Sequence, residues 1–178
     1  CACLVGSEMC IRDREDTDLI VKWRNTPSVS NHCLNKKPIT PESHLEFFSK
    51  NIETGYYLQY IVERVDEDFG VAAYPIATVY LKDIDKTNFR CELCIFTSDD
   101  EEWNNESQAI AIKKLLDKAF NELHLHKVYS YVFYKFIDEA SLLKRAGFSI
   151  EAVLRNEAMD ENGRFQDIIR FSIINENY

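Results

Sequence analysis

The sequence predicts an α+β domain, a mixed, mostly antiparallel sheet of about seven strands with helices on both faces. Short apolar segments rich in β-branched and aromatic residues recur along the chain, as strands require. Segments with helical periodicity lie between them. The expected order is one strand, two helices, three antiparallel strands, a helix, a strand, a helix and a final pair of strands. This order places helices on either side of one sheet.

The bulk composition narrows the domain count and the possible partners. A chain of 178 residues suits one domain with a full hydrophobic core. We expect residues 9–178 to form that single domain and residues 1–8 to be an N-terminal extension or a cloning remnant.

The net charge of −9 argues against nucleic acid as a partner, since phosphate binding requires a basic surface. No apolar run is long enough for a membrane span. Six cysteines without a secretory leader favour reduced thiols in the cytoplasm.

The N-terminal third is expected to hold one strand and two helices. Met9–Arg12 reads as a strand, and a helix then runs to Arg24-Asn25, because Pro27 disfavours helical backbone just before it. Thr40 is a typical cap for the second helix, which should reach about Asn51. The apolar residues that these helices should bury are Leu19, Ile20, Trp23, Leu45, Phe48 and Ile52.

Three strands joined by polar turns follow, at Tyr56–Arg64, Ile76–Lys82 and Phe89–Phe96. The last contains a C-x-x-C motif formed by Cys91 and Cys94. Side chains three residues apart in a strand point to opposite faces, which does not suit a metal knuckle or a redox turn. We therefore expect both cysteines to act as small, half-buried apolar residues.

A long helix follows these strands, because from Ala109 the apolar residues repeat with a helical period. Lys127–Phe133 is then a strand, and Asp138–Arg145 is a short helix that Asp138 should cap and Gly147 should end. The expected buried stripe of the long helix is Ala109, Ile112, Leu116, Ala119, Phe120 and Leu123.

The last two strands, Phe148–Glu157 and Phe165–Ile174, are expected to form a hairpin. Between them lies Asp160-Glu161-Asn162-Gly163, and an Asn-Gly pair is a strong hairpin signal. This hairpin completes the sheet.

The junction between the strand at Phe89–Phe96 and the long helix is the most informative place in the chain. A strand end that meets a helix start presents free backbone N–H groups and the positive end of the helix dipole. Such a junction can hold an anion such as a phosphate. The four histidines lack metal-ligand spacing, so no metal site is predicted.

The order of elements, together with several local strings, resembles the GNAT superfamily of acyl-CoA-dependent N-acetyltransferases. The resemblance covers nearly the whole chain and is nearest to the type that modifies ribosomal-protein N-termini and nucleotide-linked amino sugars. Its strings are Val21-Lys22-Trp23-Arg24-Asn25 with Pro27, Leu81-Lys82-Asp83-Ile84-Asp85, Cys91-Glu92-Leu93-Cys94-Ile95-Phe96, Ala119-Phe120-Asn121-Glu122-Leu123 with Leu125-His126-Lys127-Val128, and Ala146-Gly147-Phe148.

The resemblance implies acetyl-CoA as co-substrate and direct transfer of the acetyl group to an amine. Glu92 would be the base, and Tyr134 is the nearest residue that could protonate the departing thiolate. Ile95, Phe96 and Thr97 would contact the pantetheine arm. The residues implied at the pyrophosphate turn are Asn104, Asn105, Glu106, Ser107, Gln108 and Ala109, and those implied beside the substrate are Trp23, Arg24, Asn25 and His32.

The chain departs from the family pattern in three places. Glu106 and Gln108 occupy the positions of two defining glycines, and Asn104 replaces a third. Glycine there lets the backbone approach the phosphate, whereas the charge of Glu106 would repel it. The positions of the usual Asn and Tyr of the short helix hold Phe136 and Leu143, while Ala77 replaces a strand glycine. An alternative is that Asn105, Glu106 or Ser107 caps the long helix and takes the place of the anion.

Other readings of single residues stay open at this stage. Glu92 is either a base whose pKa burial raises or a cross-strand ion-pair partner of a Lys or Arg. Trp23 suits core packing more than substrate contact, whereas the guanidinium of Arg24 suits phosphate or carboxylate. Exposure to solvent suits His32 better than contact with an acceptor amine. The acidic loop Asp99–Glu102 is most simply solvated, although beside a cofactor groove it would favour cationic substrates and disfavour anionic ones.

Three functions are compatible with these features. The first is an acetyl-CoA-dependent N-acetyltransferase acting on a primary amine of a small molecule, such as an amino sugar, or of a peptide terminus. The second is a GNAT-fold binding or regulatory module that has lost acetyl-CoA binding. The third is an acyltransferase with a carrier-protein donor, whose phosphopantetheine arm does not need a pyrophosphate turn. The oligomeric state is not predicted.

Overall fold

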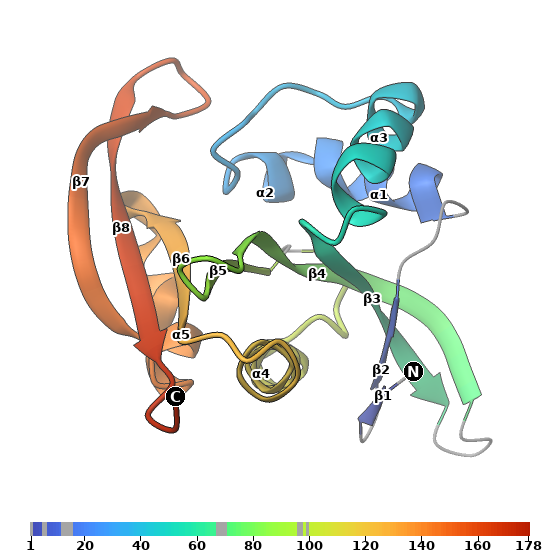
Figure 1. Ribbon diagram of the computed structural model, residues 1–178. Coiled ribbons are helices and arrows are strands. Elements are labelled where there is room, and N and C mark those ends of the chain that lie inside the picture. The colour runs from blue at the N-terminus through green and yellow to red at the C-terminus, as the bar shows by residue number, and fades with distance from the viewer. Residues whose placement is uncertain (1, 5–6, 12–15, 67–70, 96–97, 99) are drawn as a thin grey trace.

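The computed structural model describes residues 2–4, 7–11, 16–66, 71–95, 98 and 100–178, which form one mixed sheet of eight strands (Figure 1). The strand order is β1-β2-β3-β4-β5-β6-β8-β7. The pair β5–β6 is parallel, and all the other neighbours are antiparallel. The strands are β1 (Ala2–Leu4), β2 (Ser7–Ile11), β3 (Leu58–Asp66), β4 (Val71–Asp85), β5 (Arg90–Ile95), β6 (Lys127–Phe133), β7 (Ser149–Met159) and β8 (Phe165–Ile174).

This architecture confirms the predicted α+β class with a mostly antiparallel sheet. The count of about seven was one too low, because Ala2–Leu4 pairs with β2 as an edge strand and was set aside from the fold. Two other strands are longer than expected. β2 includes Ser7 and Glu8, and β4 begins five residues before Ile76.

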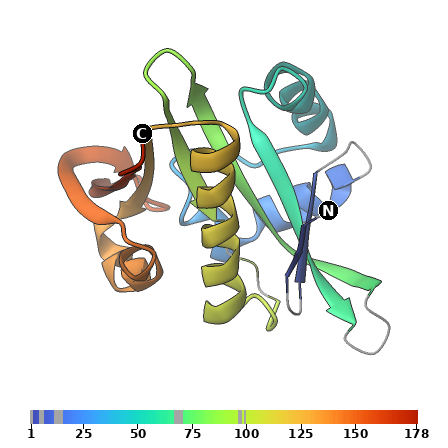
Figure 2. The same cartoon turned by 60° about the horizontal axis from the view of Figure 1, so that its bottom comes forward.

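Helices cover both faces of the sheet, as Figures 1 and 2 show. α1 (Thr17–Asn25), α2 (Pro27–Ser30) and α3 (Pro41–Phe47) lie over one face, and α4 (Asn105–Asp117) lies over the other. α3 and α4 each continue as one π-helical turn, at Phe48–Ile52 and Lys118–Glu122. A 3-10 segment, Tyr134–Ala140, leads from β6 into α5 (Ser141–Arg145). Within the described residues, no helix is long and apolar enough to cross a membrane.

Two apolar clusters hold these layers together. On β3, the side chain of Ile61 packs with Ile20 and Trp23 of α1, while its neighbours Tyr60 and Val62 belong to the main core on the α4 side. This alternation follows from the two-residue period of a strand. On α4 and its extension, the fully buried residues are Ala111, Ile112, Leu115 and Ala119. The sheet thus separates a large core from a small one.

The predicted stripe of the long helix is confirmed at Ile112 and Ala119, which are fully buried, and is wrong at Ala109. Ala109 is exposed, whereas Ala111 and Leu115, which the stripe omitted, are fully buried. One residue corresponds to a rotation of about 100° around a helix, so the positions that border a buried stripe are the hardest to assign from sequence. The remaining stripe residues Leu116, Phe120 and Leu123 pack at the edge of the core.

The N-terminal helices begin and end as predicted, with one addition. Thr40 and Ser43 form a reciprocal capping box at the start of α3. Pro27 follows the end of α1, but it is also the first residue of α2, which the prediction placed in an irregular segment. On α3, Leu45 is 41% exposed and His44 is 4% exposed, so the expected burial of Leu45 was wrong.

The C-terminal turns follow the predicted chemistry more closely than the short helix does. Gly147 and Gly163 both have positive φ, at 97° and 73°. The carboxylate of Asp160 accepts hydrogen bonds from the backbone N–H groups of Asn162 and Arg164 at the hairpin tip. Asp138, by contrast, lies inside the 3-10 segment, and α5 starts after Ala140 without a side-chain cap, so the prediction that Asp138 caps this helix was wrong.

Candidate active site

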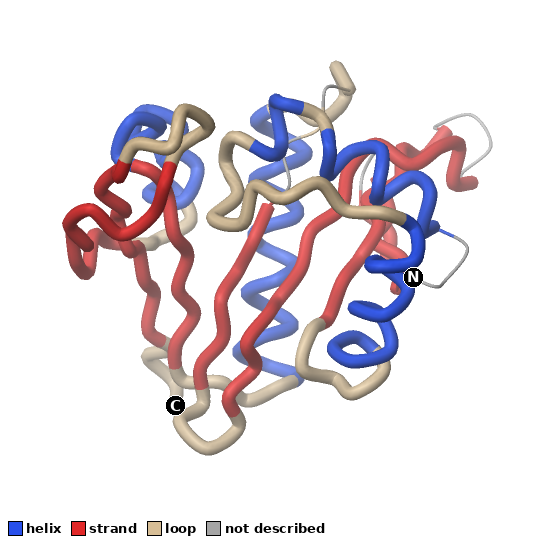
Figure 3. Tube along the Cα trace, turned by 90° about the horizontal axis from the view of Figure 1, so that it is seen from above, coloured by secondary structure: helices blue, strands red, loops and turns tan. Residues whose placement is uncertain are grey.

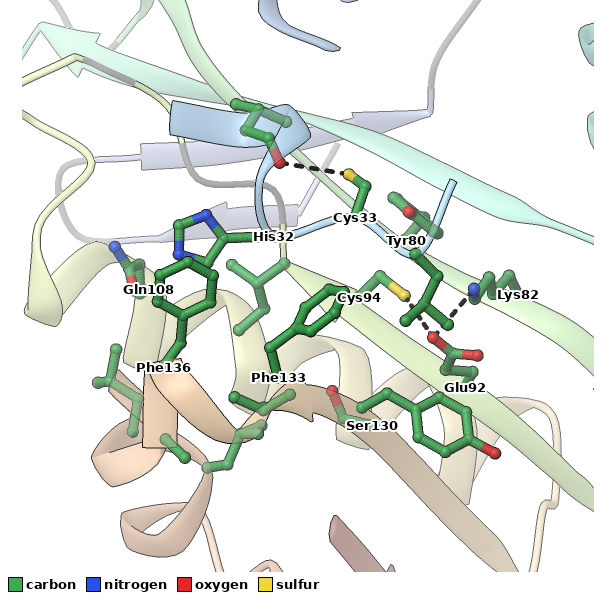
Figure 4. Close-up of a pocket in the computed structure, with 18 of the residues that line it drawn as sticks. His32, Cys33, Tyr80, Lys82, Glu92, Cys94, Gln108, Ser130, Phe133 and Phe136 are labelled. Atoms are coloured by element: carbon green, nitrogen blue, oxygen red, sulfur yellow. Dashed lines mark hydrogen bonds and ion pairs between the residues drawn. The ribbon is translucent and has the colours of Figure 1, made fainter. Parts of the chain in front are cut away.

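The two central strands β5 and β6 pair only at one end. Their register contains Arg90↔Lys127, Cys91↔Val128 and Glu92↔Tyr129, although β5 continues to Ile95 and β6 to Phe133. The strands of the sheet spread apart towards one side of the molecule (Figure 3). A cavity of about 330 Å³ lies where β5 and β6 diverge, walled by these strands, by β4 and by the segment around α2 (Figure 4).

Glu92 lies at the point where the strands separate and is 5% exposed. Its Oε1 atom is 3.0 Å from Lys82 Nζ, which lies directly opposite on β4. The thiol of Cys94 donates to the same oxygen at 3.1 Å. Figure 4 shows both side chains pointing at the carboxylate. Because both contacts use Oε1, Oε2 remains for a water or an incoming amine.

Glu92 is both a buried carboxylate and a cross-strand ion-pair partner of Lys82, while its role as a base stays a prediction. Burial raises the pKa of Glu92, and the opposing effect of Lys82 does not cancel this. Burial alone would lower the pKa of Lys82, but Cys94 and Glu92 beside it raise the pKa by more. A buried carboxylate with a raised pKa beside a fixed cation is suited to take up a proton near neutral pH.

The wall opposite β5 is largely apolar. It includes Phe133 of β6, then Phe136, and then Leu142 and Leu143 of α5. The ring of Phe136 stacks on His32 with 4.0 Å between ring centroids. Leu143 stands where the resemblance expects a tyrosine. It lines the cavity, but its side chain has no acidic proton to donate to a thiolate.

Tyr134 does not occupy the place of that missing tyrosine. Its side chain is 54% exposed and is not among the residues that line the cavity. The hydroxyl and thiol groups that do line it belong to Tyr80, Ser130, Tyr131, Cys33 and Cys94.

The four residues expected beside the substrate divide into two pairs. Arg24 and His32 line the cavity. Trp23 is 6% exposed and packs in the small core with Ile20. Asn25 holds the loop after α2, because its side chain accepts from the backbone N–H of Ile39 at 2.9 Å and donates to its carbonyl at 2.8 Å. Trp23 and Asn25 thus support the wall from which Arg24 projects.

The start of α4 is capped by Asn104 rather than by a residue within the helix. The side-chain oxygen of Asn104 accepts from the backbone N–H groups of Glu106 at 2.9 Å and Ser107 at 3.3 Å. The hydroxyl of Ser107 donates to the carbonyls of Glu102 and Asn104. The expectation that Asn105, Glu106 or Ser107 caps the helix was therefore wrong, and the cap is Asn104. Its side chain occupies two backbone N–H groups that a phosphate could otherwise use.

The described residues that were expected to bind the cofactor divide between two adjoining openings, except for Asn104 and Ser107, which line neither. Ile95 and Gln108 line the cavity of Glu92, while Phe96 and Thr97 lie outside the described residues. A second opening of about 640 Å³ runs between α4 and α5, and Leu142 borders both. The residues lining this groove are Asn105, Glu106, Ala109, Lys113, Leu116, Leu142, Arg145 and Ala146.

The groove could hold an anionic ligand, although one carboxylate opposes it. Lys113 and Arg145 contribute two positive charges, and Ala109 and Ala146 leave room beside the helix. Glu106 contributes one negative charge at the same place. Within the part of the chain that the structure describes, no group of three or more His, Cys, Asp or Glu side chains could hold a metal ion.

Lys82 is the main site residue that the sequence analysis missed. A cross-strand Lys or Arg was expected for Glu92 but could not be named. The pair Asp85↔Arg90 at the turn would, by simple counting, place Asp83 opposite Glu92. A register shift between Lys82 and Asp85, where Asp83 has a φ of 52°, moves Lys82 into that position instead.

Comparisons with known proteins find relatives of similar length and a solved structure of the same fold. A spermidine N(1)-acetyltransferase from Vibrio cholerae is 23% identical over 176 residues, which cover 98% of this chain and 97% of that protein. An N-acetyltransferase of Bacillus licheniformis named p20 is 24% identical over 92% of this chain and 90% of its own length. The crystal structure of the Vibrio spermidine N-acetyltransferase in complex with CoA and spermine superposes with a TM-score of 0.84 at 23% identity, covering 96% of each chain.

The sequence model of the acetyltransferase (GNAT) domain matches residues 10–149, which is most of the chain. The matched segment contains β5, the capped start of α4 and the β6–α5 wall, so it includes both openings of the candidate site. The fold and this match lead to one conclusion: the chain belongs to the GNAT family of N-acetyltransferases.

Proposed function

We propose that the protein transfers the acetyl group of acetyl-CoA to a primary amine of a small molecule, such as an amino sugar, or of a peptide terminus. The observation that carries this proposal is the buried Glu92, paired with Lys82, at the point where β5 and β6 separate. A carboxylate in this position can accept a proton from an amine that enters the cavity. The same strand edge leaves backbone groups free for the amides of a pantetheine arm.

The reaction begins with an acceptor that enters as an ammonium ion. Glu92 takes a proton from it through Oε2, and the free amine attacks the carbonyl carbon of the thioester. The C–S bond then breaks, and the nitrogen keeps the acetyl group and releases its second proton, which replaces the proton that the CoA thiolate takes up. Because Leu143 and Phe136 replace the usual polar residues, this last proton comes from a hydroxyl or thiol of the lining or from water.

The donor would lie across both openings. The groove between α4 and α5 offers Lys113 and Arg145 to the phosphates, and Leu142 marks the passage towards Glu92. The Vibrio relative with CoA bound has the same fold, which supports acetyl-CoA as the donor for this chain as well.

A second candidate is a binding or regulatory module that has lost acetyl-CoA. The specific observation in its favour is the start of α4, where Asn104 occupies two backbone donors and Glu106 adds a negative charge. Both features weaken an anion site without disturbing the fold.

Thermal unfolding with and without millimolar acetyl-CoA separates the two candidates. A ligand that binds only the folded protein raises the midpoint of unfolding, because it adds about 2.7 kcal/mol to the free energy of unfolding at a ligand concentration of a hundred times its Kd. We expect acetyl-CoA and CoA to raise it. No shift, together with no calorimetric binding, would overturn the proposal, and binding of an acyl carrier-protein thioester instead would identify that donor.

A further inference from the structure

The cavity contains a buried cation whose hydrogen bonds are incomplete. Arg24, in the last turn of α1, lines the cavity and is 9% exposed. One guanidinium nitrogen, Nη2, donates to the backbone carbonyl of Asn35. The other, Nη1, is buried and has no hydrogen-bond partner among the described residues. A buried charged donor without a partner is costly, unless a ligand completes its bonds.

Two further cations lie against rings of the same aromatic wall, although neither lines the cavity itself. Lys36 Nζ is 4.4 Å from the ring centroid of Phe133, and Lys135 Nζ is 4.9 Å from that of Phe136. Lys36 also donates to the carbonyls of Asn31 and Cys33, which uses two of its three N–H groups. Burial lowers the pKa of Lys36, and the neighbouring positive charge of Lys135 lowers it further.

Few negative charges face these cations. Glu92 is the only carboxylate among the described residues of the lining, and Lys82 is paired with it. Outside the lining, Glu161 is paired with Lys135 at 2.6 Å, and Asp160 is occupied by the hairpin backbone and by Gln166. The acceptor side of the cavity is therefore locally positive, although the chain has a net charge of −9.

We propose that the acceptor amine carries an anionic group, a carboxylate or a phosphate, and that Arg24 receives this group while Glu92 receives the amine. The inference rests on the proposed function and specifies its acceptor. A guanidinium forms paired hydrogen bonds with either anion, and Nη1 of Arg24 is a buried donor without a partner among the described residues. A polyamine has only positive charges to offer, and the cavity contains no unpaired carboxylate among the described residues to bind them.

Matched acceptors test this specificity. We would measure kcat/KM from CoA release with glucosamine 6-phosphate against glucosamine, alanine against alaninamide, and spermidine. We expect the anionic member of at least one pair to exceed its neutral partner by about tenfold or more, from one charged hydrogen-bonded contact. The phosphate pair and the carboxylate pair distinguish the two anions. Equal rates within both pairs, or spermidine as the best acceptor, would overturn the inference and leave the proposed function standing.

A variant separates recognition by Arg24 from its role in holding the Asn35 loop. Arg24→Lys keeps a positive charge but loses the fork, so kcat/KM should fall about tenfold to a hundredfold for the anionic acceptor and little for its neutral partner. An equal fall for both would show that Arg24 only anchors the loop. Lys22→Ala is the matched control, since this exposed lysine lies on the same helix and does not line the cavity.

Two further measurements cover the remaining outcomes. If Arg24→Lys does not fold, Lys36→Gln should lower kcat/KM selectively for the anionic acceptor, and an unselective change would contradict the inference. If no acceptor in the panel reacts, inorganic phosphate should still raise the thermal midpoint of the wild type more than that of Arg24→Lys, and equal shifts would overturn it. Failure of the proposed function itself is read separately, from the absence of any acetyl-CoA shift.

Discussion

The cavity between β5 and β6 and the groove between α4 and α5 adjoin at Leu142, yet they place the same kind of residue in opposite environments. In the cavity, Glu92 is 5% exposed, has its pKa raised by burial and is fixed by Lys82. In the groove, Glu106 is exposed in the first turn of α4. Desolvation and a fixed partner can make a carboxylate a base, whereas an exposed carboxylate acts on a ligand only through its charge.

The largest expected effect comes from replacing Glu92, the buried glutamate of the pair. Glu92→Gln should lower kcat about a hundredfold, because the amide cannot accept the proton. The Kd of acetyl-CoA should change little, since the groove is untouched. Steady-state kinetics and calorimetry measure the two quantities. An unchanged kcat would exclude Glu92 as the base and make the ion pair with Lys82 purely structural.

A second prediction concerns the pH dependence. Glu92 acts when ionised, so kcat/KM should rise with pH through its pKa and then level off. Lys82 lowers that pKa, so Lys82→Met should move the rising limb to higher pH. Lys86→Met, at an exposed position of the same β4–β5 hairpin, is the matched control and should leave the profile in place. A limb that stays fixed in Lys82→Met would contradict the assignment of that limb to Glu92.

The smallest expected effect lies in the groove. Glu106→Gln should tighten acetyl-CoA binding about twofold to fivefold, because it removes a like charge near the phosphates at a solvent-exposed site. Lys113→Gln should weaken binding by a similar factor, and both changes should shrink as salt is added. Calorimetric Kd values at low and high ionic strength provide the measurement. Weaker binding by Glu106→Gln would place the phosphates elsewhere.

The sequence predicted those parts of the fold that local chemistry specifies. Thr40 before Pro41 marks the start of α3, and Asn162-Gly163 marks the last hairpin, because caps and turns depend on a few adjacent residues. Burial depends on how elements dock. On α3, His44 is buried and Leu45 is exposed. Hydrophobicity predicts the reverse, because it does not contain the angle at which the helix docks.

The sequence predicted that the candidate site lies where β5 meets the start of α4, but it did not predict all of the side chains that line it. Glu92 and Arg24 line the cavity as their positions suggested. Lys82 was missed because a register irregularity near Asp83 sets its pairing, and such irregularities are decided by tertiary contacts. Tyr134 failed to reach the cavity because the chain turns into a 3-10 segment at that residue, which leaves its ring in solvent.

The short pairing of β5 with β6 has a consequence for dynamics. Past Glu92 and Tyr129, the facing backbone groups of the two strands do not bond to each other. Amide hydrogens on this inner edge should exchange with solvent faster than those of the paired end, because local protection follows hydrogen bonding and burial. Acetyl-CoA bound between the strands would hydrogen-bond to these backbone groups and slow the exchange. Hydrogen exchange at this edge would therefore report whether the acyl donor is bound.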